Sequence, residues 1–387
     1  MHPFPPILGI SYVKDNGGRT PLHTAAETGN IDTCQQLISK GAKVDVVDSS
    51  NKTPLHIAVA TGYLNICQLL ISKGAAIDTI DCGKKTLLHR AVATGNLDIC
   101  QLLISKGAEI DAIDSWEKTP LHRAVETGNI GICELLISKG AAIDTINAQK
   151  ETSLHMAVAT ENLDICELLI SKGAKVDAKN YLNRSPLHIA AATGNLDICQ
   201  LLISKGAAID VIDSWKLTPL HRALHRFSET NTFTCQLLIS KGAEIDAIDS
   251  RERTPLHRAV ETGNIGICEL LISKGAAIDT INAQKETSLH MAVATENLDI
   301  CELLISKGAI VDAKDSFNRT PLHIAVKTGN IDICQLLISN GAAIDAIDSG
   351  KKTPLLRAIA TGNSDIYQLL ISKGAKIDAL DSGRLEI

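Results

Sequence analysis

Histidine and cysteine recur regularly along this sequence, and both side chains can bind metal ions. Ten of its 12 histidines and ten of its 11 cysteines recur at one fixed interval along the chain. The recurring cysteines are Cys34, Cys67, Cys100, Cys133, Cys166, Cys199, Cys235, Cys268, Cys301 and Cys334. Such a ladder suggests zinc binding, which needs four ligands converging at about 2.0–2.3 Å. Whether the ligands can converge depends on the elements that carry them.

Those elements are the units of an internal repeat. Successive units start 33 residues apart, with one interval of 36 residues between Thr218 and Thr254. Eleven copies of a period of this length indicate stacked repeat units rather than separate globular domains. The low aromatic content, 3%, agrees with a core of thin aliphatic layers. The run Thr-Pro-Leu-His, or a close variant, begins at Thr20, Thr53, Thr86, Thr119, Thr152, Ser185, Thr218, Thr254, Thr287, Thr320 and Thr353.

The repeat argues against a zinc site. Equivalent residues in neighbouring units should lie about one helix-packing distance apart, roughly 8–10 Å. This distance is too long for shared metal ligands and exceeds the Cα separation of about 7 Å that a disulfide allows. We therefore expect each histidine to orient its own turn and each cysteine to fill a core position, with no metal ion and no cofactor. Cys82, in a turn, is expected to be an exposed thiol, and the reduced cysteines indicate a cytoplasmic protein.

Each unit predicts two short helices and a projecting loop. In residues 185–217, Ser185 is a helix N-cap and Pro186 suits the first helical position. Gly194 ends the first helix, and a second helix runs from Leu196 to the residue before Gly206. Its apolar residues lie on two flanks, which predicts packing against neighbours on both sides.

These units resemble the ankyrin repeat. The resemblance rests on runs such as Thr254-Pro255-Leu256-His257, Gly263-Asn264, Leu270-Leu271 and Gly275-Ala276, and it covers residues 15–381. It implies an all-α repeat solenoid: a helix–loop–helix stack with β-hairpin fingers. We expect a lead-in and first finger in residues 1–19, eleven repeats in residues 20–381 and a short tail in residues 382–387. Departures are Leu87, Ser153 and Ser288 in place of proline, and Leu356 in place of the histidine.

The copies differ at the ends and in the middle. Counting from the Thr or Ser as place 1, the first unit has Thr33 and Gln36 at places 14 and 17, while the last has Ser364 and Tyr367 at places 12 and 15. We infer that places 14 and 17 face the preceding repeat, that places 12 and 15 face the following one, and that the array is complete. The seventh unit carries a three-residue insertion, and residues 109–174 and 244–309 are near-identical.

Partner-binding residues are expected where the copies vary. Both tryptophans and Phe317 stand three residues before a motif Thr, at the tip of a finger, where no core exists for an aromatic side chain to fill. The resemblance implies that fingertips and the first helices line a concave groove that binds proteins. The candidate partner-binding residues are Trp116, Lys118, Arg123, Leu182, Trp215, Arg222, Arg251, Arg258 and Phe317.

Charge and motif content limit the classes of function. The net charge is −6, and glutamates lie among the lysines and arginines that recur in the fingers and first helices. Nucleic-acid binding is therefore a weaker alternative. No run of apolar residues reaches the length of a membrane-spanning helix, and no motif for catalysis is present. We expect a monomeric, non-enzymatic scaffold that binds one or more proteins, without nucleic acid or membrane. A host-directed effector of an intracellular bacterium would use the same mode of binding and is kept as an alternative.

Overall fold

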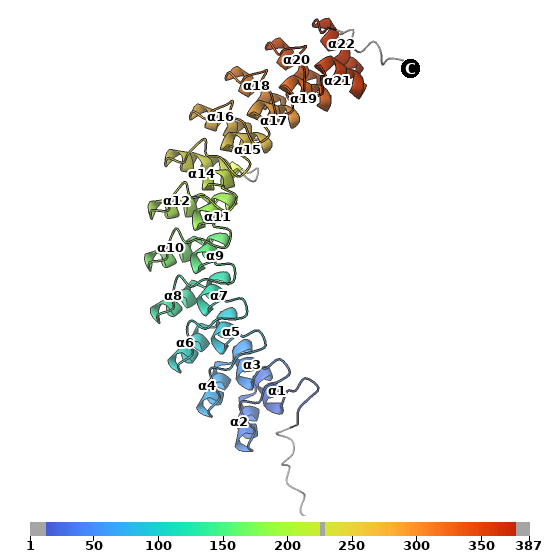
Figure 1. Ribbon diagram of the computed structural model, residues 1–387. Coiled ribbons are helices and arrows are strands. Elements are labelled where there is room, and N and C mark those ends of the chain that lie inside the picture. Colours follow the sequence, from blue (N-terminus) through green and yellow to red (C-terminus); the bar gives the residue numbers. More distant parts are fainter. Residues whose placement is uncertain (1–12, 225–228, 377–387) are drawn as a thin grey trace, which may run out of the picture. The chain divides into compact units, whose positions relative to one another are not determined.

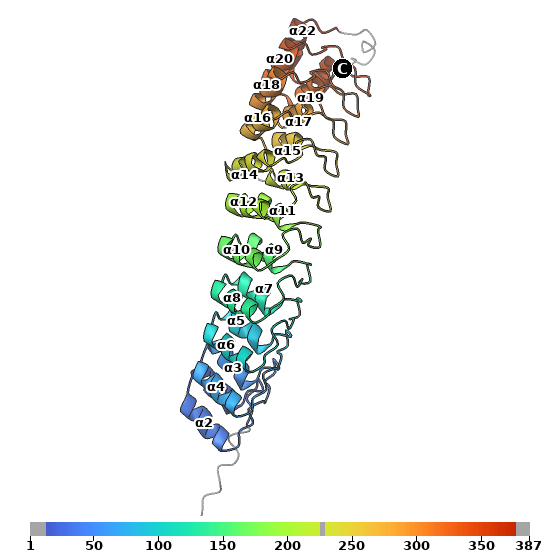
Figure 2. The same ribbon diagram turned by 90° about the vertical axis from the view of Figure 1, so that its left-hand side faces the viewer.

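The computed structural model describes residues 13–224 and 229–376, which form 22 helices. The chain divides into two compact units, Met1–Pro186 and Leu187–Ile387. Within each unit the helices follow one another in pairs, and the loops that join the pairs project on one side of them (Figure 1, Figure 2). These pairs confirm the predicted all-α helix–loop–helix repeat fold.

In the first unit, the first helix of each pair packs on the first helix of the next pair, and the second helices pack likewise. The helices are α1 (Pro21–Thr28), α2 (Ile31–Ser39), α3 (Pro54–Thr61), α4 (Leu64–Ser72), α5 (Leu87–Ala93), α6 (Leu97–Ser105), α7 (Pro120–Glu126), α8 (Ile130–Ser138), α9 (Ser153–Ala159) and α10 (Leu163–Ser171).

The second unit follows the same plan from α13 and α14 onward. Its helices are α11 (Pro186–Thr193), α12 (Leu196–Ser204), α13 (Pro219–Ala223), α14 (Glu229–Ser240), α15 (Pro255–Glu261), α16 (Ile265–Ser273), α17 (Ser288–Ala294), α18 (Leu298–Ser306), α19 (Pro321–Thr328), α20 (Ile331–Ser339), α21 (Pro354–Thr361) and α22 (Ser364–Ser372). The extra residues of the seventh repeat lengthen α14 to 12 residues, where the second helix elsewhere has nine, as in α16.

Local chemistry explains where the helices begin and end. The motif Thr caps the first helix and shares a capping box with the histidine three residues later, as Thr119 does with His122. An asparagine caps most second helices; Asn129, for example, accepts a hydrogen bond from the backbone N–H of Ile132 at 3.0 Å. Because these caps satisfy N–H groups that no helical bond reaches, each nine-residue helix begins at a defined residue.

The fingers consist of turns, and one isolated bridge, between Ile80 and Thr86, is the β pairing found in the described residues. Neighbouring fingers are joined by individual hydrogen bonds rather than by the pairing of β-strands. The carboxylate of Asp111 accepts the backbone N–H of Ala142 at 3.0 Å, and the carbonyl of Trp116 accepts that of Ala148 at 3.1 Å. The fingers implied by the resemblance are therefore present, with turn geometry in place of regular strands.

The core is a stack of small aliphatic layers. Places 14, 15 and 18 of the second helix are fully buried, as Ile66, Cys67 and Leu70 show. Place 17 is half-buried at Leu69, and place 12 is 39% exposed at Ile331. The expectation that places 12 and 17 are buried between repeats was therefore wrong, because the packed side of the helix centres on places 14, 15 and 18.

Candidate protein-interaction surface

The histidine ladder is part of the frame of the repeats. The backbone N–H of Thr119 donates to Nδ1 of His122 at 3.1 Å, and the Thr119 hydroxyl lies 2.9 Å from the same nitrogen. Nε2 lies 3.2 Å from the carbonyl of Glu151, the residue just before the next motif Thr. Since Nδ1 accepts a hydrogen bond, we assign the proton to Nε2, which donates to that carbonyl. The histidine thus joins two successive repeats.

Burial keeps these histidines neutral. It lowers the pKa of His122, although the hydrogen bond to the carbonyl of Glu151 partly opposes the shift. Burial is also the largest cause that lowers the pKa of His56 and His221, in both cases to about 4. Among the described residues, no group of three or more His, Cys, Asp or Glu side chains is placed to hold a metal ion.

The cysteine ladder is buried and free of disulfides. Burial raises the pKa of Cys100, Cys199 and Cys268 to about 12, which keeps these thiols protonated at neutral pH. Cys82 lies outside the ladder and is exposed, as expected from its position in a turn.

An aspartate shapes the turn of most fingers. Oδ1 of Asp114 accepts the backbone N–H groups of Trp116 at 2.8 Å and Lys118 at 3.0 Å. The next residue after Trp116, Glu117, has a positive φ of 57°. This tight turn points the side chain of Trp116 out of the fold, and the indole is 59% exposed.

The same aspartates pair with arginines at place 5. Arg123 donates to Oδ2 of Asp114 at 3.0 Å, and Arg258 donates to Oδ2 of Asp249 at 2.8 Å. Burial alone would raise the pKa of Asp249, but hydrogen bonds from the backbone of Arg253 and the guanidinium of Arg258 lower it to about 2. The corresponding pairs elsewhere are Arg90 with Asp81, Arg222 with Asp213 and Arg357 with Asp348. Each pair fixes a finger to the first helix of its own repeat.

The candidate basic residues are thus less free than the sequence suggests. Arg222 is buried at 9% exposure, and its guanidinium carbon lies 5.4 Å from the ring centre of Trp215. Arg123 also pairs with Glu126 at 2.7 Å, and Lys118 reaches the same carboxylate at 3.0 Å. Arg251, in contrast, is exposed at its fingertip. Sequence reasoning treated all of these side chains as open anchors, but only the fingertip is open.

The aromatic fingertips are exposed. Trp215 and Phe317 are 44% and 58% exposed. At the fingertip of the sixth repeat, Leu182 is half-buried while the residue before it, Tyr181, is 71% exposed. Tyr181 was not predicted, because it stands one position before the place that Trp116, Trp215 and Phe317 occupy in their repeats. Trp116, Lys118, Arg123 and Leu182 belong to the first unit, and Trp215, Arg222, Arg251, Arg258 and Phe317 belong to the second.

A second set of exposed residues, which occupy one place of the repeat, was also not predicted from the sequence. The residue just before the turn Asp or Asn is an exposed isoleucine in seven repeats and an exposed valine, Val47, in another. In the first, sixth and tenth repeats this position holds Lys14, Lys179 and Lys314. The isoleucines are Ile80, Ile113, Ile146, Ile212, Ile248, Ile281 and Ile347. They recur as regularly as the residues of the frame, whereas binding residues were expected only where the copies vary.

A hollow of about 140 Å³ opens along the first helices of the second, third and fourth repeats. Small side chains leave this space, and three basic side chains border it. The lining residues are Ala60, Lys85, His89, Arg90, Ala93, Thr94 and Arg123. Place 8 of one repeat and places 0 and 5 of the next therefore line one hollow, where place 0 is the residue before the motif Thr.

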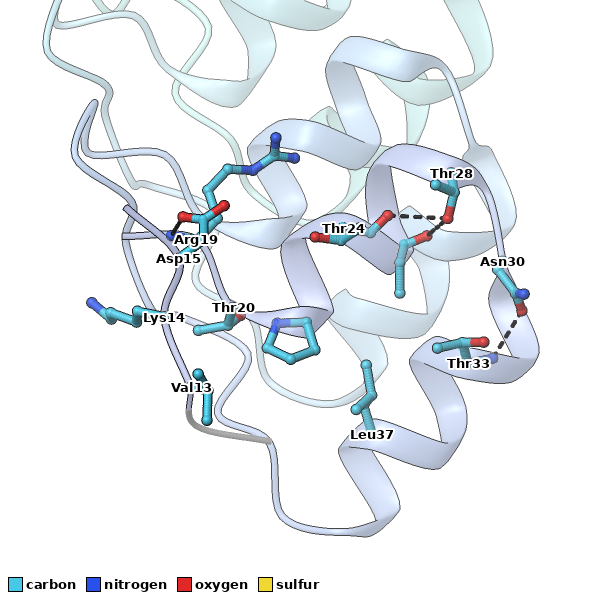
Figure 3. Close-up of a pocket in the computed structure, with 12 residues that line it drawn as sticks. Val13, Lys14, Asp15, Arg19, Thr20, Thr24, Thr28, Asn30, Thr33 and Leu37 are labelled. Atoms are coloured by element: carbon cyan, nitrogen blue, oxygen red, sulfur yellow. Dashed lines mark hydrogen bonds between the residues drawn. The ribbon is translucent and has the colours of Figure 1, made fainter. Parts of the chain in front are cut away.

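A larger hollow of about 720 Å³ lies on the flank of α1 and α2 (Figure 3). Val13, Thr24, Thr33 and Leu37 are among its lining residues. Thr33 is half-buried and Gln36 is exposed, whereas Ile66, one repeat after Thr33, is fully buried. Place 14 therefore faces the preceding repeat, as inferred from the sequence.

None of the helices in the described ranges has the length and apolar character needed to cross a membrane.

Comparison with known proteins agrees with this architecture. The family model described as "Ankyrin repeats (3 copies)" matches residues 7–81, 32–114, 88–180, 154–249, 224–315 and 309–381. No curated protein matches the chain.

Proposed function

Because the chain belongs to the ankyrin repeat family, we propose that it is a non-enzymatic scaffold that binds one or more proteins through its fingertips and first helices. Ankyrin repeats generally act as protein–protein interaction modules. The proposal applies equally to an array that works in its own cell and to an effector delivered into another, since both would use the same surface.

The exposed aromatic fingertips are the observation that carries this proposal. Trp116, Trp215 and Phe317 are large apolar side chains that lie exposed at turns. Aromatic residues of this kind supply much of the binding energy in protein interfaces. The arginines at place 5 support the fingers through their aspartates, so we assign the partner contacts to the fingertips and give Arg123, Arg222 and Arg258 a positioning role.

The test is the double substitution Trp116→Ala with Trp215→Ala. Truncating an interface tryptophan typically costs about 2 kcal/mol, so partner affinity should fall roughly thirtyfold. Thermal unfolding should stay nearly unchanged because neither indole is buried. Both quantities can be measured on one sample, by quantitative affinity capture with mass spectrometry and by calorimetry.

The duplicated segment supplies the control, since Arg251 stands in one copy where Trp116 stands in the other. Arg251→Ala should change capture much less than Trp116→Ala. These two tryptophans are also the only ones in the chain, so partner binding should shift the intrinsic fluorescence. A double variant that unfolds several degrees earlier and still captures the partner would show that the tryptophans pack rather than bind.

A further inference from the structure

The groove between neighbouring first helices is bordered by a set of three side chains that we call a groove triplet: place 8 of one repeat and places 0 and 5 of the next. In the hollow of about 140 Å³ the triplet is Ala60, Lys85 and Arg90. Places 0 and 8 of one repeat are also close. Arg253 and Glu261 lie 3.0 Å apart, as do Lys118 and Glu126.

The groove triplet between the tenth and eleventh repeats is entirely basic: Lys327, Lys352 and Arg357. Arg357 is paired with Asp348. Lys327 and Lys352 are exposed, and their ammonium groups form no ion pair with any residue in the described ranges. In the first, fourth and eighth repeats place 8 is a glutamate that pairs with the base at place 0, whereas the tenth repeat has Lys327, another cation, at this place.

The surrounding residues extend this basic surface. Residues 314–361 contain six lysines and arginines and four carboxylates. Two of those carboxylates are buried: Asp315 is bound to Arg319 at 2.6 Å, and Asp348 is bound to Arg357. The equivalent stretch two repeats earlier, residues 248–295, contains five cations and six carboxylates. The basic surface is therefore local to the last two repeats.

An exposed aromatic ring borders the basic side chains. The backbone N–H of Ser349 donates to the carbonyl of Phe317 at 2.8 Å, which places the next turn, with the exposed Lys351, beside this fingertip. The guanidinium carbon of Arg319 lies 4.9 Å from the ring centre of Phe317. Cations and an aromatic ring are thus within reach of one bound segment.

We propose that Phe317, Lys327, Lys351, Lys352 and Arg357 form a docking surface for an acidic segment of a partner protein that carries an apolar residue for Phe317. This inference rests on the proposed scaffold function and names the chemistry of one partner. Charge complementarity supports it, since a local excess of unpaired lysines on a chain of net charge −6 attracts carboxylates to this surface. A nucleic acid fits less well, because its phosphates would continue past Glu261 and Glu286 in the preceding grooves of the same unit.

The experiment uses the full chain and three fluorescent probes at low salt. The first probe is a short peptide of alternating Glu and Ser with one central Phe. The second has Gln in place of each Glu, and the third is a single-stranded DNA of similar length. We expect the acidic peptide to bind, the Gln peptide to bind much more weakly, and added salt to weaken binding. Tighter binding of the DNA, equal binding of the two peptides, or no binding of the acidic peptide would overturn the proposal.

The decisive variant is Lys327→Glu with Lys352→Glu. Reversing two interface charges should weaken acidic-peptide binding by roughly tenfold or more. The matched control is Lys274→Glu with Lys307→Glu, which makes the same charge change at exposed C-caps of second helices and should alter binding less than about twofold. Equal losses in both variants would show a bulk charge effect and no docking surface.

The outcomes separate this inference from the proposed function. If partner capture depends on Trp116 and Trp215 but not on Lys327 and Lys352, the scaffold function stands and the acidic-segment inference fails. If neither pair of substitutions affects capture, the fingertip proposal fails as well.

Discussion

In the second unit, Glu261, Glu286 and Met291 occupy the same three places that Lys327, Lys352 and Arg357 occupy two repeats later. The frame beneath them is the same. Nε2 of His257 lies 3.2 Å from the carbonyl of Glu286, and Nε2 of His323 lies 3.1 Å from the carbonyl of Lys352. The frame uses the backbone of place 0, so the side chain at that place can change charge without disturbing the stack.

Repeats eight and nine also contain both versions of the turn. Arg258 pairs with Asp249, whereas Met291 accompanies Asn282, whose amide donates to Glu286 at 3.0 Å. Arginine at place 5 occurs with aspartate in the turn, and methionine occurs with asparagine. In these two repeats the residue at place 5 thus differs together with the residue of the turn, while the groove between repeats accommodates either sign of charge.

The largest change in the free energy of unfolding should follow a lowering of the pH, because both of the regions compared above depend on neutral histidines. Burial lowers the pKa values of His257, His290 and His323 below 6.5, so the native state binds fewer protons than the unfolded state. The free energy of unfolding should therefore have its full value above about pH 6.5. It should fall as the pH decreases, by up to about 1.4 kcal/mol per pH unit for each histidine.

Denaturant titrations at a series of pH values would measure this loss. The turn carboxylates also lower the stability as the pH falls, but over a more acidic range. The pKa of Asp249 is lowered to about 2, so its contribution is lost only below its unfolded value, near pH 4. A stability that is flat between neutrality and pH 5 would contradict the assignment of the histidines as buried and neutral.

The next largest effect concerns the matched turn pair. Arg357→Met leaves the buried carboxylate of Asp348 without its cation and should cost about 2 kcal/mol of stability. Adding Asp348→Asn should recover most of that loss, because Met291 with Asn282 is a working pair in the same frame. A double-mutant cycle by urea denaturation measures the coupling. Additive losses would refute the matched-pair interpretation.

A smaller effect concerns the loop between the paired helices. Glu296 adopts a φ of 56°, whereas the equivalent residues of the eighth and tenth repeats are Gly263 and Gly329, with φ of 73° and 86°. Glu296→Gly should raise the free energy of unfolding by up to about 1 kcal/mol, since the left-handed conformation strains a side chain. Gly329→Glu is the reciprocal control and should destabilise. Thermal denaturation that ranks the two variants in the reverse order would contradict this reasoning.

The smallest effect on stability should follow a change of charge in the groove. Glu261→Lys with Glu286→Lys should alter the free energy of unfolding by less than about 1 kcal/mol, because both glutamates are partly exposed or exposed. The variant should nevertheless gain affinity for the acidic peptide, since repeats eight and nine would then carry the charges of repeats ten and eleven. Unchanged peptide binding would show that the charges of the groove triplet are not sufficient.

The pattern of local interactions could be predicted from the sequence. Thr119 and His122 are three residues apart, the distance that a capping box spans, and Asp114 reaches N–H groups two and four residues ahead. The exposure of Trp116 also follows from its place in a turn. These interactions were accessible because each is completed within a few residues of chain.

Interactions between distant residues could not be predicted in the same way. The pairing of Arg123 with Asp114 joins a helix to a finger nine residues earlier, and no local rule places those side chains together. The same limitation concealed the exposure of place 12 on the second helix.

The repeat, its helices, its caps and the absence of disulfides between the regularly spaced cysteines follow from the order of residues alone, because a fixed period and hydrogen bonds between near neighbours depend only on that order. The three-dimensional packing was needed to show which arginines are paired, which fingertips are exposed and which three places share a groove. The groove triplets combine residues of two neighbouring repeats, and only the packing of one repeat on the next determines their distance and exposure.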